Sequence, residues 1–497
     1  MRAAEATSEV VEITGGRVAG DRRDGVSRLL GITYGRPTGG VRRFRAPRPR
    51  AAWGGTLPVR GYGPACPQPP IRQNLVIDPE VERAMFSLND EPQSEDCLSL
   101  NLWTSGADDA ARPVMVSLHG GGFKSGSGSA RSAPWFDGTR LAARGDVVVV
   151  TVNQGIGVLG HLALDSIEGS GNAGLLDLVG ALEWIRDHVA CFGGDPSRVT
   201  IFGESGGGGK VLALMAMPAA TGLFHRAAAQ SATLDWLSPE EAGRVTRSVM
   251  DALGVDSVPQ LAAVGVRRMV DAGATVTRAG MRFGPVIDGT TLPRGALDSL
   301  ADGASADVPL MIGVTRDEAA AFLPVGGEMG WDAVERRFGE RATGYRGLHP
   351  GFSARRALID LMTDDMFRSA ALGAAEVKSS RPGAPVFMFE FAWRTPVLGG
   401  RLGAAHGVDV AFPFDNTELH PASAGSASAR RLAPVVSDCW IAFARDGDPR
   451  HDDLSEWPPH DAAGGATLVF DDECHLARRP SAGSEGAQPA PGETVTR

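Results

Sequence analysis

The sequence predicts a mostly parallel α/β sheet with helices on both faces, and three observations support this fold class. Short apolar runs with the length of buried strands recur along the chain, and the first three lead into glycine-rich loops. These runs are residues 114–118, 147–152, 199–202, 308–314 and 386–391. Between them, residues 175–189 place apolar side chains at the i, i+3, i+4 and i+7 spacing of a helix. Strands that alternate with helices form parallel sheets, which bind ligands at the carboxyl ends of their strands.

The two ends of the chain depart from this central pattern. Residues 10–34 alternate apolar residues with glycines and polar residues, as short antiparallel strands joined by turns do. Proline and arginine then dominate to about residue 72, which predicts a loop. From residue 477 the chain is rich in Pro, Gly, Ser and Ala without periodicity, so we expect residues 477–497 to form a disordered tail.

Composition indicates a globular chain and argues against several classes of protein. The 497 residues are 43% hydrophobic, and the net charge of −10 comes without a basic block, so we expect no nucleic-acid partner. The first residues lack the apolar core of a signal peptide, and no apolar run is long enough to span a bilayer, which predicts a cytoplasmic protein without membrane attachment. The five cysteines lack zinc-site spacing and are an odd number, which argues against a full disulfide framework.

A glycine-rich turn follows the strand at residues 199–202, and it can be interpreted as a phosphate loop or as a nucleophile turn. The phosphate-loop motif fails, because Glu204 occupies its first glycine position and Val211 replaces its hydroxyl residue. Gly203-Glu204-Ser205-Gly206-Gly207 instead matches G-x-S-x-G, the strand-to-helix turn that exposes a nucleophilic serine. Because the chain has 65 glycines, the motif also arises by chance, and the prediction of Ser205 as nucleophile depends on its context.

A serine that attacks a carbonyl needs donors for the oxyanion that develops in the transition state. His119-Gly-Gly-Gly-Phe123 follows the strand at residues 114–118 and has the H-G-G-G pattern of an oxyanion loop. We therefore predict the backbone amides of Gly121, Gly122 and Gly206 as the oxyanion donors.

Several motifs together resemble those of the type B carboxylesterases, the carboxylesterase/cholinesterase family of α/β hydrolases. They are Glu95-Asp-Cys-Leu-Ser-Leu-Asn101, His119-Gly-Gly-Gly-Phe123, Phe192-Gly-Gly-Asp-Pro196 and Val199-Thr-Ile-Phe-Gly-Glu-Ser205. The resemblance extends from Gly31 to Pro458. It implies an α/β-hydrolase fold in a single catalytic domain, residues 1–476, with inserted loops and helices over an active-site gorge.

The resemblance also implies a triad of Ser205, Glu318 and His406. The family places its acid in an Asp-Glu pair after a strand, which makes Glu318 the acid and Asp317 its rival. His406 lies in a small-residue loop that matches the family's histidine motif, and it follows the acid in the chain order Ser, acid, His. The other histidines that satisfy this order are His349, His420, His451, His460 and His475.

The implied function is hydrolysis of carboxylic esters by an acyl-enzyme mechanism that needs no metal or cofactor. Beside the triad, Glu204 and Ser231 resemble residues that support it in relatives, although a purely structural role is also open for each. We interpret His119, Asn172 and Asp177 as structural.

Departures from the family pattern bear on substrate. Gly206 stands where the family usually has alanine, and residues 153–160 lack its usual aromatic and arginine. We expect gorge walls from residues 60–95, 275–285 and 320–370. They would include Phe283, Phe322 and Met366, with Phe123 beside the oxyanion loop, and no single residue is assigned as a substrate contact. Cys66 and Cys97 match a pair that is disulfide-bonded in secreted relatives, and we predict that they are close together and reduced.

The expected partner is a small, uncharged ester with a short or medium acyl chain, and the expected assembly is a monomer or weak homo-oligomer. Two alternatives stay open: an amidase, carbamate hydrolase or toxin-ester hydrolase with the same triad, and a non-catalytic binding module on the same fold. The binding module would need a broken triad, and all three residues are present.

Overall fold

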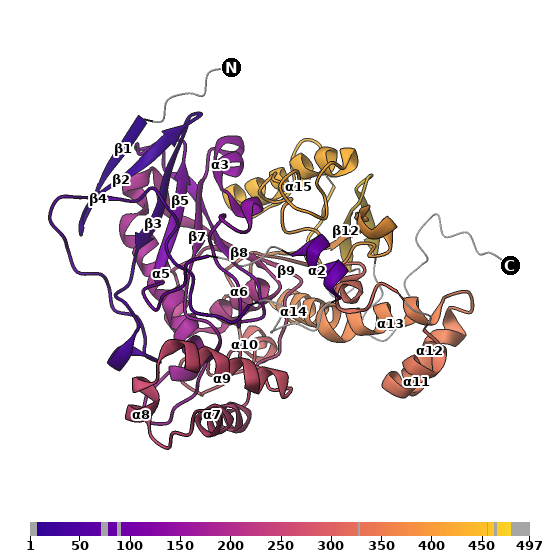
Figure 1. Cartoon of the computed structure of the whole chain (residues 1–497). Coiled ribbons are helices and arrows are strands. Elements are labelled where there is room, and N and C mark those ends of the chain that lie inside the picture. The colour runs from indigo at the N-terminus through magenta and orange to yellow at the C-terminus, as the bar shows by residue number, and fades with distance from the viewer. Residues whose placement is uncertain are drawn as a thin grey trace.

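The computed structural model describes residues 7–70, 78–86, 91–326, 329–454, 456–461 and 465–478. Its centre is one twisted sheet in the order β1-β2-β3-β5-β7-β6-β8-β9-β10-β11-β12-β13, with β4 paired to β2 (Figure 1). The first strands are β1 (Thr7–Ile13), β2 (Gly16–Arg23), β3 (Val26–Thr33), β4 (Thr56–Pro58) and β5 (Ser99–Thr104). The later ones are β6 (Arg112–Leu118), β7 (Val148–Val152), β8 (Gly194–Glu204), β9 (Arg226–Gln230), β10 (Leu310–Thr315), β11 (Val386–Phe391), β12 (Ala466–Phe470) and β13 (His475–Arg478).

The sheet is antiparallel at both edges and parallel in the middle. β1, β2, β3 and β5 pair antiparallel, and β5 joins β7 antiparallel. From β7 to β12 every pairing is parallel, as expected for strands that are buried on both faces. The predicted fold class is therefore confirmed, as is the antiparallel start of the chain.

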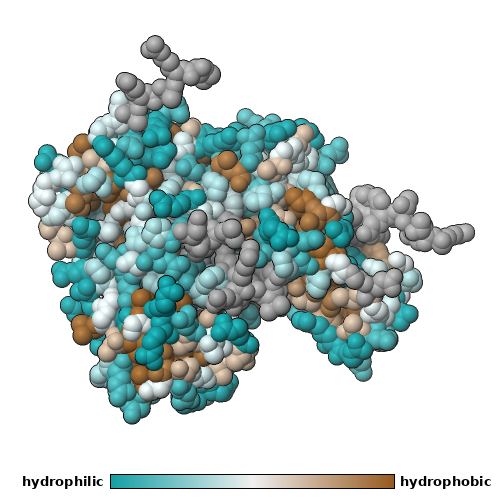
Figure 2. Space-filling model, in the orientation of Figure 1, coloured by the Kyte–Doolittle hydropathy of each residue, from teal (hydrophilic) through white to brown (hydrophobic). Residues whose placement is uncertain are grey.

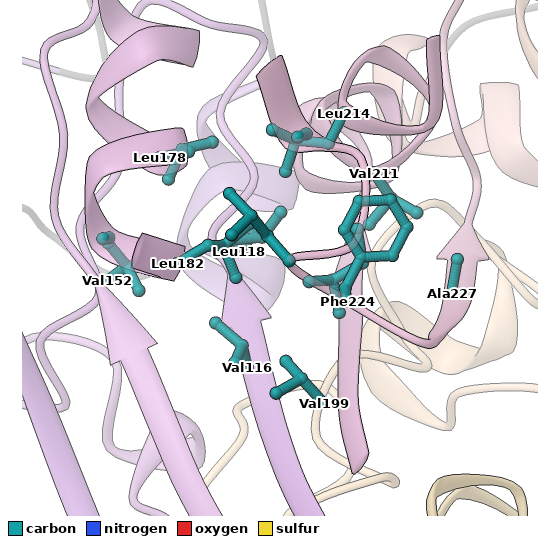
Figure 3. Close-up of a cluster of buried hydrophobic side chains, with 14 of the residues drawn as sticks. Val116, Leu118, Val152, Leu178, Leu182, Val199, Val211, Leu214, Phe224 and Ala227 are labelled. Carbon is teal, nitrogen blue, oxygen red and sulfur yellow. The ribbon is translucent and has the colours of Figure 1, made fainter. Parts of the chain in front are cut away.

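Alternate residues of the central strands contact two different layers of helices. One face packs on α5 (Ala173–His188), α6 (Gly206–Ala216) and α14 (Ser369–Ser379), and the other packs on α3 (Thr139–Gly145) and α15 (Ala427–Asp446). Figure 3 shows part of the first layer, where Leu182 of α5 and Val211 of α6 lie over Val116 and Leu118 of β6. Because strand side chains alternate, this arrangement buries both faces of the sheet.

Further helices lie outside these layers. α7 (Pro239–Leu253), α8 (Val258–Ala263) and α9 (Val266–Arg278) form one group, and α11 (Trp331–Phe338), α12 (Glu340–Leu348) and α13 (Ala354–Thr363) form another at a distance from it (Figure 1). The remaining α-helices described are α2 (Pro79–Met85), α4 (Gly157–Gly160) and α10 (Ala296–Ala301). A π-helical turn, Asp364–Arg368, connects α13 to α14.

Two predicted boundaries are wrong. The stretch expected to be loop contains the short strand β4, which pairs with β2. Ala477 and Arg478, expected in the tail, belong to β13, because their backbone groups pair with β12. Residues 479–497 lie outside the described part.

The surface is mostly hydrophilic on the face shown in Figure 2, with hydrophobic residues in small separate patches. Within the described ranges, no helix has both the length and the apolar character that a membrane span requires.

Candidate active site

Ser205 lies at a strained turn between β8 and α6. Its backbone angles are φ 60° and ψ −123°, a left-handed region that non-glycine residues rarely adopt. A Cβ on Gly203 would stand 2.5 Å from the carbonyl oxygen of Leu118, and one on Gly207 would stand 2.1 Å from the same atom. The two flanking glycines of the motif are thus required because the turn packs directly against the end of β6. The structure therefore has a tight strand-to-helix turn at Ser205, as the G-x-S-x-G motif predicts.

The oxyanion loop follows β6 and lies against this turn. Gly121, Gly122 and Phe123 have φ values of 95°, 59° and 61°. A Cβ on Gly206 would stand only 2.7 Å from the amide nitrogen of Gly122, so the predicted donors on the loop and on the helix are neighbours. In the described part of the chain, the amides of Gly121 and Gly122 donate no hydrogen bond, and the amide of Gly206 is at the open N-terminus of α6. The three amides are therefore available to an anion.

Glu318 and His406 form a buried pair. Nδ1 of His406 lies 2.5 Å from Oε2 of Glu318, and the other carboxylate oxygen accepts a hydrogen bond from the amide of Thr315 at 2.8 Å. Glu318 lies three residues past the end of β10, and His406 is in the long loop after β11. The carboxylate fixes the ring so that Nδ1 carries a proton and Nε2 faces away from Glu318.

Asp317, the rival acid, has a different partner. Its carboxylate accepts hydrogen bonds from the guanidinium of Arg356 and, at 2.8 Å, from the amide of Ala404. Its own amide donates to the carbonyl of Ala404 at 3.0 Å. Asp317 therefore holds the loop that carries His406. None of the other histidines considered from the sequence forms an ion pair with Glu318 in the described part of the chain.

Nε2 of His406 forms no hydrogen bond with Ser205 among the described residues, and it lies near a second carboxylate without a hydrogen bond to it. It lies 3.3 Å from Oε1 of Glu204, the residue that precedes Ser205. Hydrogen bonds among catalytic groups are often absent or long before substrate binds, so this geometry is compatible with a later contact between His406 and Ser205. Phe367 and Phe322 pack against the imidazole with ring centroids at 4.6 and 5.2 Å.

Three carboxylates surround His406 and change its titration. Burial by itself lowers the pKa of His406, but the charges of Glu204 and Glu318 outweigh that effect and raise it to about 9. Burial raises the pKa of Glu204 to about 8, and the neighbouring charges of Asp409 and Glu318 act in the same direction. Burial likewise raises the pKa of Asp409 to about 6, although its carboxylate accepts a hydrogen bond from Gln230 at 2.7 Å. The neighbouring carboxylates therefore favour the protonated imidazole, and burial favours the neutral carboxyl groups.

The sequence interpretation missed Asp409. The only available signal was its position three residues after His406 on the same loop, where an acidic residue is also common at a surface. Phe322, which the sequence interpretation named as a gorge residue, packs on the imidazole, and so does Phe367, which it did not name singly. A hollow beside the oxyanion loop is lined by Phe283, which was predicted to be at the gorge, and by Lys124.

The remaining predicted residues have structural contacts. Ser231 has a left-handed φ of 48° and donates its amide to Gly313 at 2.8 Å, and its buried hydroxyl has no partner among the described residues. Asn172 donates its side chain to the carbonyl of Val286 at 2.8 Å, and Asp177 accepts from the amide of Gly155 at 2.9 Å. These contacts fit the interpretation of Asn172 and Asp177 as structural residues.

His119 and the cysteine pair are also buried. His119 contacts the carbonyl of Gly120 through Nδ1 at 2.8 Å. Cys66 and Cys97 are free, buried thiols, and a hydrogen bond with Cys66 together with burial raises the pKa of Cys97. The two thiols are close together, as predicted. In the described ranges, no group of three His, Cys, Asp or Glu side chains is placed to hold a metal ion.

Comparisons with known proteins agree with this arrangement. The model of the carboxylesterase family matches residues 7–345 and 348–482. Phenmedipham hydrolase from Pseudarthrobacter oxydans is 35% identical over 94% of this chain and 96% of its own, and para-nitrobenzyl esterase from Bacillus subtilis (strain 168) is 34% identical over 95% and 97%. The crystal structure of a Geobacillus stearothermophilus carboxylesterase superimposes with a TM-score of 0.83 at 34% identity, covering 95% of this chain and 98% of the other.

Proposed function

The chain belongs to the carboxylesterase family, and on that premise we propose that it hydrolyses carboxylic esters to acid and alcohol through an acyl-enzyme on Ser205. One observation carries the assignment of residues. The strained Ser205, the glycine amides beside it and the buried Glu318–His406 pair follow β8, β6, β10 and β11, which all belong to the parallel run β6-β8-β9-β10-β11 of the sheet. The carboxyl ends of such strands meet at one edge, where open α/β sheets hold their ligands.

In the first half of the reaction, His406 accepts the hydroxyl proton of Ser205 while the oxygen attacks the ester carbonyl carbon. The charge that develops on the carbonyl oxygen is stabilised by the amides of Gly121, Gly122 and Gly206, with the N-terminus of α6 adding its dipole. The tetrahedral intermediate then expels the alcohol, which takes the proton from His406.

In the second half, water replaces the alcohol. His406 removes a proton from the water, the resulting oxygen attacks the acyl carbon, and the bond to Ser205 breaks as the serine recovers its proton. Glu318 keeps the imidazole in the useful tautomer and stabilises the imidazolium without taking its proton. His406 acts as a base only when Nε2 is unprotonated, so the neighbouring charge of Glu204, which raises the pKa of His406, opposes both half-reactions at low pH.

The triad does not fix the substrate within this class. We propose uncharged esters of short or medium acyl chains as the small-molecule partner. Hydrolysis of amides, carbamates or toxin esters is the second candidate, because the same nucleophile serves those bonds and one similar protein is named phenmedipham hydrolase. Rates across esters from acetyl to dodecanoyl, with an amide and a carbamate of matched leaving group, separate these choices.

We also propose a cytoplasmic protein that is a monomer or a weak homo-oligomer. In the reducing cytosol, the neighbouring thiols of Cys66 and Cys97 would stay free. A count of free thiols in rapidly quenched cells tests it, and a fully blocked pair contradicts it.

The test of the function compares wild type with Ser205→Ala on p-nitrophenyl acetate and butyrate, with an organophosphate label traced to its peptide. We expect turnover and a label on Ser205 in wild type, and a loss of several orders of magnitude in the variant. Ser197→Ala is the matched control, because Ser197 is exposed near the opposite end of β8. A folded wild-type protein with neither turnover nor label would instead support the non-catalytic binding module.

A further inference from the structure

Lys210 is a buried lysine on the helix that begins directly after Ser205. Its side chain is 1% exposed, among the largest fully buried side chains in the described structure. Nζ donates a hydrogen bond to the carbonyl oxygen of His119 at 2.8 Å, and it lies 6.0 Å from the centre of the Phe123 ring. His119 and Phe123 are the two residues that flank the oxyanion loop, so the amine contacts both ends of that loop.

This lysine is unfavourable for stability where it lies. Burial lowers the pKa of Lys210 to about 7, and no neighbouring carboxylate in the described part of the chain opposes the effect. A buried amine without a counter-charge costs folding free energy, and an apolar side chain of similar volume usually avoids that cost. Packing therefore does not explain the residue, whereas its contact with the oxyanion loop does.

Other hydrogen bonds tie the loop to its own C-terminal side, where the carbonyl of Gly121 accepts from the amides of Lys124 and Ser125 at 3.2 and 3.1 Å, and in the described part of the chain the bond from Lys210 is the one that ties it to α6. Gly121 and Gly122 have no side chains, and their left-handed backbone leaves both amides without a protein acceptor among the described residues. The third predicted donor, Gly206, is on α6, the helix that carries Lys210. The hydrogen bond from Lys210 to His119 therefore joins the two halves of the oxyanion hole.

We propose that Lys210 is a positioning residue for ester hydrolysis, whose Nζ holds the carbonyl of His119 so that the loop amides stay aligned with the oxyanion formed at Ser205. The inference rests on the proposed function and adds a residue outside the triad to it. Lys210 touches no reacting atom, so its loss should affect binding of the transition state far more than binding of the substrate.

The test is Lys210→Met, which preserves most of the side-chain volume and removes the donor. With rates counted per serine titrated by the organophosphate, unfolded molecules do not contribute. We expect kcat for p-nitrophenyl butyrate to fall about 10- to 100-fold, the range for a donor displaced by about 1 Å, with KM within about threefold of wild type. The inhibition constant of an alkyl trifluoromethyl ketone, which forms the tetrahedral adduct, should rise by the same factor as kcat/KM falls. The urea midpoint should not decrease, because a buried amine is removed.

Lys378→Met is the matched control. Lys378 is also a buried lysine, 5% exposed, and its Nζ donates to the carbonyls of Ser305 and Ala306 at 2.8 and 3.3 Å. Those carbonyls precede β10, at the edge of the sheet opposite to Glu318. This variant should keep the wild-type kcat and ketone affinity.

Two results would overturn the inference: a wild-type kcat per titrated site in Lys210→Met, or an equal loss in Lys378→Met. Should the methionine variant yield no titratable protein, Lys210→Leu, which also removes the donor, gives the same comparison. An unchanged ketone affinity in it would equally reject the role. If wild type neither hydrolyses esters nor labels at Ser205, the proposed function itself fails and this inference fails with it.

Discussion

Replacing Gly206 with alanine measures how closely the oxyanion loop must approach the nucleophile turn. The added Cβ would lie 2.7 Å from the nitrogen of Gly122, 3.1 Å from its Cα and 3.2 Å from the nitrogen of Phe123. All three neighbours are backbone atoms, so no side-chain rotation relieves the contact. Ordinary separations begin at about 3.5 Å, so the loop has to move away by about 0.8 Å.

Gly206→Ala has two opposing effects on the free energy of unfolding, whereas its effect on kcat/KM is only a decrease. Alanine favours the helix over glycine by about 0.5–1 kcal/mol, which offsets part of the strain in the displaced loop. A displacement near 1 Å costs up to about 100-fold in rate, and full loss of one oxyanion donor costs about 100- to 1,000-fold. We therefore expect Gly206→Ala to lower kcat/KM by about 10- to 100-fold while the unfolding free energy changes by less than about 1 kcal/mol.

The assay is kcat/KM for p-nitrophenyl butyrate per titrated site, together with urea unfolding. The control is Gly243→Ala in α7, where the nearest neighbour of the new Cβ is the flexible guanidinium of Arg247 at 3.4 Å. That substitution should raise stability by about 0.5–1 kcal/mol and leave the rate unchanged. A Gly206→Ala enzyme as fast as wild type would refute the packing argument, because the loop would then align its amides without the close approach.

Three further predictions concern the charged groups of the site. Glu318→Gln should lower kcat by about 1,000- to 10,000-fold, since the amide loses the charge that stabilises the imidazolium, and Asp317→Asn should lose far less if Glu318 is the acid. Glu204→Gln removes a charge that raises the pKa of His406, so the acid limb of the kcat/KM profile should move to lower pH, and an unmoved limb would contradict this role. Burial lowers the pKa of Lys210 to about 7, so between pH 7 and about 10 the unfolded wild-type chain binds more protons than the folded one. The unfolding free energy of wild type should therefore rise with pH in that window by an amount that Lys210→Met does not show. Urea unfolding of both proteins at pH 7 and 9.5 measures this, and the unfolding free energy of wild type should increase relative to that of the variant at the higher pH.

The sequence was sufficient for the fold and for the main residues of the site because both follow from order along the chain. Apolar runs predicted the central strands, and parallel strands bring their carboxyl ends to one edge. Ser205 directly follows one of those strands and was predicted from its motif, whereas Glu318, three residues past the end of β10, was predicted from the Asp-Glu pair of the family it resembles. His406 is farther from its strand, and it was chosen by its resemblance to a family motif rather than by periodicity.

The residues that the sequence did not reveal depend on contacts between distant segments. Lys210 and His119 are on different elements, and nothing near Lys210 in sequence indicates that its amine is buried against a carbonyl. Asp409 is an ordinary acidic loop residue until the fold encloses it beside Gln230. The pairing of Glu204 with Nε2 of His406 likewise depends on side-chain directions that motif spacing does not determine.

The glycine run at the start of α6 also has a physical reason that only the packing reveals. A Cβ on Gly207 would stand 2.1 Å from the carbonyl of Leu118, and one on Gly208 would stand 2.7 Å from the carbonyl of Gln230. Each glycine costs about 1 kcal/mol of helix propensity, yet the segment is helical because β6 and β9 pack against it closely. Lys210 adds a buried amine to the same helix. The start of α6 therefore contains several residues that are unfavourable for helix stability, and they lie where Ser205 meets the oxyanion loop. Substitutions that stabilise exposed helices, such as Gly→Ala, should here reduce activity.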